Sequence, residues 1–153
     1  MSWRLHDGDL ATMTEDELDK WGASERRKVV EYLERQQGLV HGAIGEWPAW
    51  RLATRVSLWA VESVRQPGAI GWWVICGDLP TDYCTGGSDC RIPRLAVGKI
   101  VQRWRSALTQ FKDGEPTIGD LGIDGTRAPL LRTRVDALSE LLSDDAMWPD
   151  EPT

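Results

Sequence analysis

Two apolar segments joined by a tight turn constrain the fold of this chain most strongly. The segments 55–62 and 70–76 are short and rich in Val, Ile and Trp. If each forms a strand, apolar side chains point to both of its faces, so other elements must cover both faces of each predicted strand. Between them, Gln66-Pro67-Gly68-Ala69 places proline second and glycine third, as a type II turn requires. The sequence therefore predicts a β-hairpin, which must pack on other elements because an isolated ribbon is unstable in water.

Helical signals surround this hairpin. Thr14, followed three residues later by Glu17, forms a capping box that opens a helix, and Pro93 suits the first turn of another. With the apolar spacing of the remaining segments, the predicted helices cover about residues 14–21, 24–37, 93–112 and 127–143. A short strand is also expected around 117–123. The predicted fold class is α+β, a small antiparallel sheet centred on the hairpin and packed against about four helices.

Length and composition indicate one self-sufficient domain. A chain of 153 residues with 41% apolar content can bury an ordinary core without disulfide or metal staples. We expect a single domain over 1–153, with a frayed amino terminus (about 1–12) and a frayed acidic tail (about 144–153). The longest apolar stretch, 70–76, is far too short to span a membrane. Three cysteines and no secretory signal favour a reducing cytoplasm.

The charge distribution argues against nucleic acid as the partner. The formal net charge is −6, whereas phosphate binding depends on a basic surface. The segment from Arg91 to Lys112 does carry six Lys/Arg and no carboxylate. We expect these cations, except Arg91 and Arg94, to pair with the acidic ends of the same chain. Nucleic-acid binding through the predicted helix 93–112 is therefore the least favoured function.

The second strand runs directly into an acidic loop, Gly77-Asp78-Leu79-Pro80-Thr81-Asp82-Tyr83. Asp78 and Asp82 could share a metal ion, act as an acid and base, or grip a cationic group. Aspartates beside turns also cap backbone N–H groups, and this structural role is the favoured interpretation. The loop would then act as a latch between the hairpin and the helix that begins near Pro93, with Arg91 and Arg94 able to pair with its carboxylates or form an anion site.

Other catalytic and metal-binding patterns are weak. Cys76, Cys84 and Cys90 lack the close spacing of structural zinc ligands. Cys76 is expected in the core, while Cys84 and Cys90 could form a disulfide if oxidised but are expected as free thiols. There is no Gly-x-Ser-x-Gly elbow and no phosphate-binding glycine loop. No cofactor and no metal are predicted. An enzyme is not favoured, although an enzyme whose catalytic residues are Asp and Tyr alone is an alternative.

Tryptophan is the compositional outlier. Nine tryptophans accompany one phenylalanine and two tyrosines, more than a core of this size needs. Some of them can therefore serve a recognition surface. A binding pocket walled by tryptophans beside the acidic loop is one arrangement, and the candidate binding residues are Asp78, Asp82, Tyr83, Arg91, Arg94, Trp47, Trp50 and Trp73.

Several of these segments together resemble a known family. They are the run Leu58-Trp59-Ala60-Val61-Glu62-Ser63, the Pro67-Gly68 turn, the stretch from Gly71 through Gly77-Asp78-Leu79-Pro80-Thr81-Asp82-Tyr83, and Pro93-Arg94 followed by Trp104. The chain resembles an uncharacterised bacterial family, classed as a domain of unknown function, over about residues 24–112. The resemblance implies a small bacterial cytoplasmic protein and carries no activity, cofactor or catalytic residue.

Two functions follow as expectations. The first is an interaction protein, such as the immunity partner that inhibits an antibacterial toxin. Tryptophans would anchor the contact, and the acidic surface would speed capture of a basic partner. The alternative is a small-molecule-binding protein or enzyme that uses the loop of Asp78, Asp82 and Tyr83.

Overall fold

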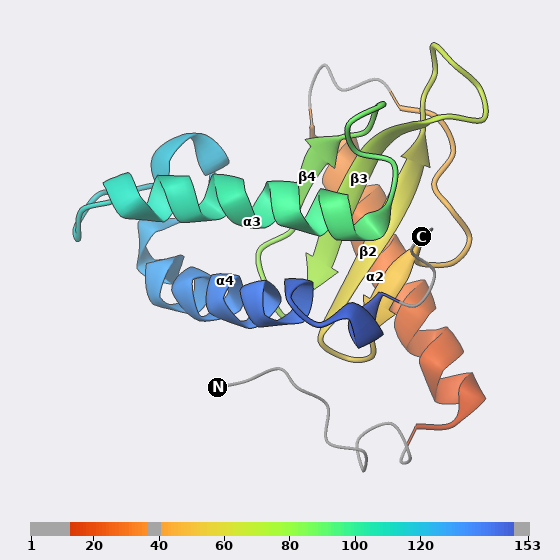
Figure 1. The fold of residues 1–153 in the computed structure, drawn as a ribbon, viewed down its shortest axis with the longest axis horizontal. Helices are drawn as coiled ribbons and strands as arrows, with labels where there is room; N and C mark the ends of the chain where they lie inside the picture. Colours follow the sequence, from red (N-terminus) through yellow and green to blue (C-terminus); the bar gives the residue numbers. More distant parts are fainter. Residues whose placement is uncertain (1–12, 37–40, 149–153) are drawn as a thin grey trace.

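The computed structural model describes residues 13–36 and 41–148 (Figure 1). Its centre is one antiparallel sheet in which the strand order, β1-β2-β3-β4, follows the order of the chain. The strands are β1 (Trp50–Leu52), β2 (Val56–Glu62), β3 (Ile70–Gly77) and β4 (Asp82–Thr85). The predicted α+β class is confirmed. The predicted frayed amino terminus, about 1–12, lies outside the described residues.

The predicted hairpin forms the middle of the sheet as β2 and β3. Leu58 pairs with Ile75 in its register. In the connecting turn, the backbone N–H of Ala69 donates to the Gln66 carbonyl at 3.0 Å, and Gly68 has a φ of +87°. A positive φ at the third position is the requirement of a type II turn, so the turn prediction is also confirmed.

Helices cover both faces of the sheet. Helix α2 (Glu15–Arg35) packs on one face, and α3 (Pro93–Gln110) and α4 (Ala128–Leu142) lie side by side on the other (Figure 1). The two-sided cover follows from the apolar residues on both faces of β2 and β3. The larger core lies under α3 and α4 and includes Leu58, Trp73, Ile75 and Trp104, and the smaller core lies under α2 and includes Val29, Leu33, Trp59 and Val74.

One continuous helix replaces the two predicted at the amino-terminal end. Thr14 caps it as expected, because its Oγ1 accepts the backbone N–H of Glu17 at 3.1 Å. The helix then runs through Ser24 without a break, so the predicted boundary between 21 and 24 was wrong. Gly22 and Glu25 are both buried, which places the expected break on the face that the sheet covers.

A buried polar contact fixes α2 on its face of the sheet. Glu25 is only 1% exposed, and its carboxylate accepts the Ser57 hydroxyl at 3.3 Å while the Lys28 ammonium lies 2.8 Å away. The Trp59 indole N–H donates to Ser57 Oγ at 2.9 Å. The hydrogen bond from Lys28 to Glu25 raises the pKa of that lysine. A buried carboxylate needs such partners, so the position of α2 is specified by more than apolar contact.

Two predictions about the carboxyl-terminal third were wrong. The strand expected at 117–123 is instead the 3-10 helix Gly119–Leu121, with a single bridge between Thr117 and Asp124. The tail expected to fray from 144 forms the 3-10 helix Asp145–Met147 and ends in Trp148, which is 5% exposed. Burial of this large aromatic side chain outweighs the acidic character of the segment. Residues 149–153 lie outside the described part of the chain.

Trp148 joins the tail to the edge of the sheet. Its ring stacks on that of Trp50 with centroids 4.4 Å apart. The two indoles donate to main-chain carbonyls, Trp148 to Leu141 at 2.9 Å and Trp50 to Met147 at 2.8 Å. Each ring is therefore both packed and hydrogen-bonded, as a buried indole requires.

We expect the substitution Trp148→Ala to destabilise the protein by about 3–5 kcal/mol, because it removes a buried aromatic ring and leaves a cavity. The matched control is Trp47→Ala, since Trp47 is 64% exposed and surface substitutions change stability by about 0.5 kcal/mol or less. Urea unfolding followed by circular dichroism measures both. Equal losses in the two variants would contradict the role assigned to Trp148.

Candidate functional site

The acidic loop closes the β3–β4 connection, and Asp82 is its buried anchor. Asp82 is 5% exposed. Its Oδ1 accepts the backbone N–H of Tyr83 at 2.8 Å, and its Oδ2 accepts the indole N–H of Trp104, on α3, at 2.8 Å. The Arg103 guanidinium forms an ion pair with the same Oδ2 and donates to the Tyr83 carbonyl at 2.7 Å. Asp82 therefore latches β4 to α3, through Arg103 and Trp104 rather than the expected Arg91 or Arg94.

Asp78 has an equivalent role toward α4. Arg134 donates to the Asp78 main-chain carbonyl and to its carboxylate, both at 2.6 Å. The preceding Gly77 has a φ of +138°, and a Cβ there would lie 2.4 Å from the Arg55 carbonyl oxygen. The close approach explains the glycine, and it is accompanied by a hydrogen bond from the Asp78 N–H to that carbonyl at 2.8 Å.

Aromatic residues surround the outer side of the loop. Tyr83 makes an edge contact with Trp72 at 5.5 Å between centroids and lies 6.3 Å from Tyr32 of α2. The Arg103 guanidinium carbon lies 5.9 Å from the centre of the Tyr83 ring. Burial, reinforced by the Asp82 carboxylate, raises the pKa of Tyr32. Tyr32 is therefore a neutral packing residue at physiological pH.

A broad polar groove lies beside this loop, with a volume of about 1030 Å³. Its walls include Tyr32, Asp82, Tyr83, Arg103, Asp120 and Arg127. The two predicted site residues in it already have partners: both oxygens of Asp82 accept hydrogen bonds, and Arg103 covers Tyr83. The contacts of Asp82 and Tyr83 indicate that the loop has a structural role.

The remaining candidate residues lie elsewhere. Trp73 is buried in the larger core, where its indole donates to the Cys90 carbonyl at 3.0 Å. Arg94 donates to the Leu142 carbonyl and pairs with Asp145 at 2.9 Å, in the carboxyl-terminal segment rather than in the acidic loop. Arg91 is exposed. The single pocket predicted from the tryptophans and the acidic loop does not form, because its residues belong to separate places on the molecule.

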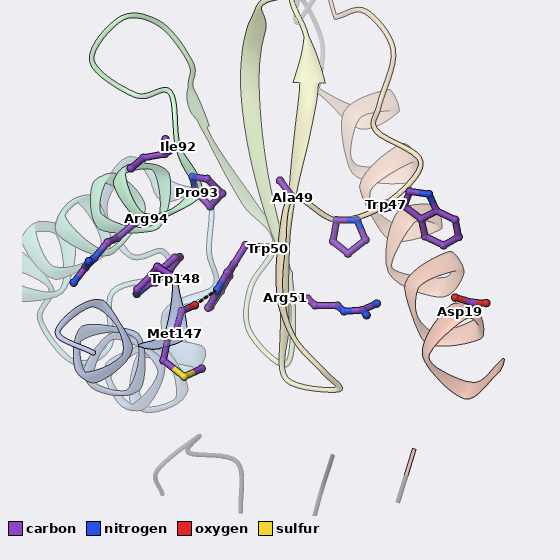
Figure 2. A pocket seen from close by; sticks show the side chains of 11 residues that line it. Asp19, Trp47, Ala49, Trp50, Arg51, Ile92, Pro93, Arg94, Met147 and Trp148 are labelled. Carbon is purple, nitrogen blue, oxygen red and sulfur yellow. Dashed lines mark hydrogen bonds between the residues drawn. The ribbon is translucent and has the colours of Figure 1, made fainter. Parts of the chain in front are cut away.

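Trp47 and Trp50 instead lie at the open edge of the sheet, in a groove of about 390 Å³ (Figure 2). We call it the edge groove. It extends from Asp19 on α2, across the segment 47–51, to the start of α3 and the tail. Its apolar wall includes Trp47, Pro48, Trp50, Pro93, Met147 and Trp148, and its charged side chains are Asp19, Arg51 and Arg94.

Trp47 differs from the other tryptophans of this groove. Figure 2 shows it on the α2 side of the edge segment, away from the stacked pair of Trp50 and Trp148. Trp50 and Trp148 use their indole N–H groups internally, whereas the Trp47 indole donates to no described residue. Of the described tryptophans, Trp47 is the one with most of its surface exposed. It offers an aromatic face and a hydrogen-bond donor to a ligand.

Sequence reasoning did not identify several residues of these sites. Met147 and Trp148 were assigned to a frayed tail, although a tryptophan followed by proline within an acidic segment was a signal of packing. Arg51, in the three-residue strand β1, had no distinguishing pattern. The partners of Asp82 were detectable in part, since Trp104 falls on the apolar face of the helix 93–112 and Arg103 precedes it.

The three cysteines are buried free thiols. Cys76 lies in the smaller core, as expected. Burial raises the pKa of Cys76 and of Cys84 to about 12, and it also raises the pKa of Cys90. Within residues 13–36 and 41–148, no group of three or more His, Cys, Asp or Glu side chains is arranged to hold a metal ion. None of the helices described is both long and apolar enough to cross a membrane.

The fold is thus a three-layer α+β domain in which an antiparallel meander is enclosed by helices and carries an aromatic groove at its open edge. The chain belongs to the family DUF4826, a domain of unknown function, and the family model matches residues 15–148. This confirms the family class expected from the segments around the hairpin. No curated protein and no solved structure matches the chain.

The contacts of the acidic loop give a prediction for Asp82. We expect Asp82→Asn to destabilise the fold by about 1.5–3 kcal/mol, the range for a hydrogen bond to a charged group. The substitution keeps an acceptor but removes the charge that faces Arg103 and the Trp104 indole. Asp78→Asn is the matched control, because the Asp78 side chain is 51% exposed and exposed pairs contribute about 1 kcal/mol or less. Chemical unfolding compares the two, and an equal or smaller loss for Asp82→Asn would exclude the latch.

The buried thiols give a prediction for the reactivity of the cysteines. At about pH 8 an unfolded cysteine is partly thiolate, whereas thiols with a pKa of about 12 stay protonated. We therefore expect Cys76 and Cys84 to resist an aromatic disulfide reagent in the native protein, and all three thiols to react once guanidinium unfolds it. The absorbance of the released thiolate counts them. Rapid reaction in the native state would show that the buried arrangement is wrong.

Proposed function

We propose that this protein functions by binding another protein, and that the edge groove is the contact surface. The observation that carries the proposal is Trp47, 64% exposed beside an aromatic groove. Tryptophan and arginine dominate the energetics of protein interfaces. The edge groove contains both, with Trp47 on one side and Arg51 and Arg94 within it.

The neighbours of Trp47 make this surface suitable as an anchor. The stacked pair of Trp50 and Trp148 is held by two main-chain hydrogen bonds, so the far wall is rigid before any partner arrives. A preorganised wall lowers the entropy cost of association.

The specific role that we propose is inhibition, as by the immunity partner of an antibacterial toxin in a bacterial cytoplasm. The net charge of −6 supports it, because an acidic surface accelerates the capture of a basic partner. The engaged carboxylates of Asp78 and Asp82 support it as well, since their hydrogen bonds occupy the groups that a catalytic function of the loop would need.

The test compares how tightly the wild type and variants of the edge groove bind a partner that the wild type captures. We expect Trp47→Ala to weaken binding of the identified, purified partner by at least about 30-fold, the effect of losing an interface hot spot. Isothermal titration measures the affinity. For the inhibitory role, the same substitution should abolish protection of cells that express the toxin encoded beside this protein's gene.

Val64→Ala is the matched control. Val64 is 52% exposed and lies in the connection between β2 and β3, outside the lining of the edge groove. It should bind the partner as the wild type does. A partner held equally by the wild type and Trp47→Ala would refute the edge groove as the contact surface. A neighbouring gene unrelated to toxins or secretion, with no partner recovered, would refute the inhibitory role.

A further inference from the structure

We infer that the edge groove binds an extended, proline-rich segment of its partner, with an acidic residue next to the prolines. The inference rests on the proposed function and specifies the chemistry of the segment that Trp47 recognises. It is carried by three features of the groove: an exposed indole whose N–H has no described acceptor, ring-shaped side chains along the walls, and a cation that pairs with no described residue.

The exposed indole favours a polyproline helix. A polyproline II segment has no internal hydrogen bonds, so its carbonyl groups are free to accept. Trp47 presents an indole N–H that donates to none of the described residues. It therefore supplies both a flat face for a proline ring and a donor for a main-chain carbonyl, the combination that aromatic-lined grooves use to bind such segments.

The walls of the groove fit the same ligand. Trp47, Pro48 and Pro93 line it, which gives flat and rigid surfaces on which proline rings can pack. Its volume of about 390 Å³ is in the range of small-ligand pockets, so it accommodates a short segment rather than a folded domain. A segment already restricted to one conformation loses little entropy when it binds.

Two other extended or helical ligands fit less well. A partner strand would add to β1, but β1 has three residues, follows Pro48 and carries Arg51, features that protect an edge from strand pairing. A partner helix satisfies its own main-chain carbonyls, so its interior offers no acceptor to Trp47. A helix also needs a continuous apolar trough, whereas Asp19, Arg51 and Arg94 interrupt this groove.

The charges in the groove select an acidic neighbour. Arg51 is exposed and forms no ion pair with any described residue. Arg94 adds a second cation, already paired with Asp145, and the first turn of α3 contains no acidic residue. Asp19, on the α2 side, is the carboxylate in the lining. Figure 2 shows Arg51 extending toward the α2 side of the edge segment, where Trp47 lies, so a glutamate of the ligand would bind Arg51 next to the prolines that pack on Trp47.

The experiment uses the full chain and synthetic peptides. The indole signals of the tryptophans are recorded by nitrogen-proton correlation NMR, and the Trp47 signal is assigned from its loss in Trp47→Phe. We expect an octaproline peptide ending in two glutamates to shift the Trp47 signal saturably. The same octaproline ending in two lysines should bind up to about fivefold more weakly, the effect of one exposed charge pair.

Matched variants and peptides separate the contributions. Trp47→Ala, which lacks the indole signal and is measured by isothermal titration, should not bind the peptides. Arg51→Ala should reduce the preference for glutamate over lysine, and Val64→Ala should change neither the binding nor the preference. A Gly-Ser peptide with the same glutamates should not shift the signal. The inference is wrong if no proline peptide shifts Trp47 at millimolar concentration, if the Gly-Ser peptide binds as well, or if a β-strand-forming peptide binds more tightly.

The two proposals fail in distinguishable ways. If the proline peptides do not bind but the purified partner still depends on Trp47, the polyproline chemistry is wrong and the contact surface stands. If the partner binds independently of Trp47, the contact surface itself is wrong.

Discussion

The central strands β2 and β3 are apolar on both faces, and the rest of the structure follows from covering them. A sheet of this kind needs a layer on each side, and the chain supplies α2 on one face and the pair α3 and α4 on the other (Figure 1). Each layer is then fixed by a buried carboxylate. Glu25 accepts Ser57 beneath α2, and Asp82 accepts the Trp104 indole beneath α3. Because a buried carboxylate is costly without partners, these contacts favour one arrangement of helices over others of equal apolar burial.

The need to fix helices on the sheet also explains the structural role of the acidic loop. Its turn brings β4 alongside β3, and its two aspartates bind the helices that cover the sheet, Asp82 through Arg103 and Asp78 through Arg134. The aromatic residues on its other side, Tyr32 and Tyr83, pack where α2 meets the edge strand β4. Functional groups that are engaged in this way hold the scaffold rigid. We propose that recognition uses a different surface, one whose side chains the fold does not engage.

The opposite edge of the sheet is such a surface. β1 is short and lacks a neighbouring strand on its outer side within the described chain. The tail closes part of this edge through the stack of Trp148 on Trp50, which leaves a rigid aromatic wall. Trp47 is not drawn into that stack and stays exposed (Figure 2). An exposed tryptophan beside a preformed wall is costly to leave in water and favourable to cover, which is why we place the partner here.

The hairpin, its type II turn, the positions of the helical segments and the family class were determined by the sequence alone, although the single helix α2 was predicted as two. Alternation, proline and glycine at turn positions, and the capping pair of Thr14 and Glu17 act over a few residues, so they can be detected without the fold. Only the tertiary structure decided which groups meet. Arg91 and Arg94 are near the loop in sequence, but α3 crosses the sheet so that Arg103 and Trp104, about 15 Å further along the helix, reach Asp82. Composition likewise shows an excess of tryptophan without saying that Trp148 is buried and Trp47 exposed, because burial depends on which distant segments pack together.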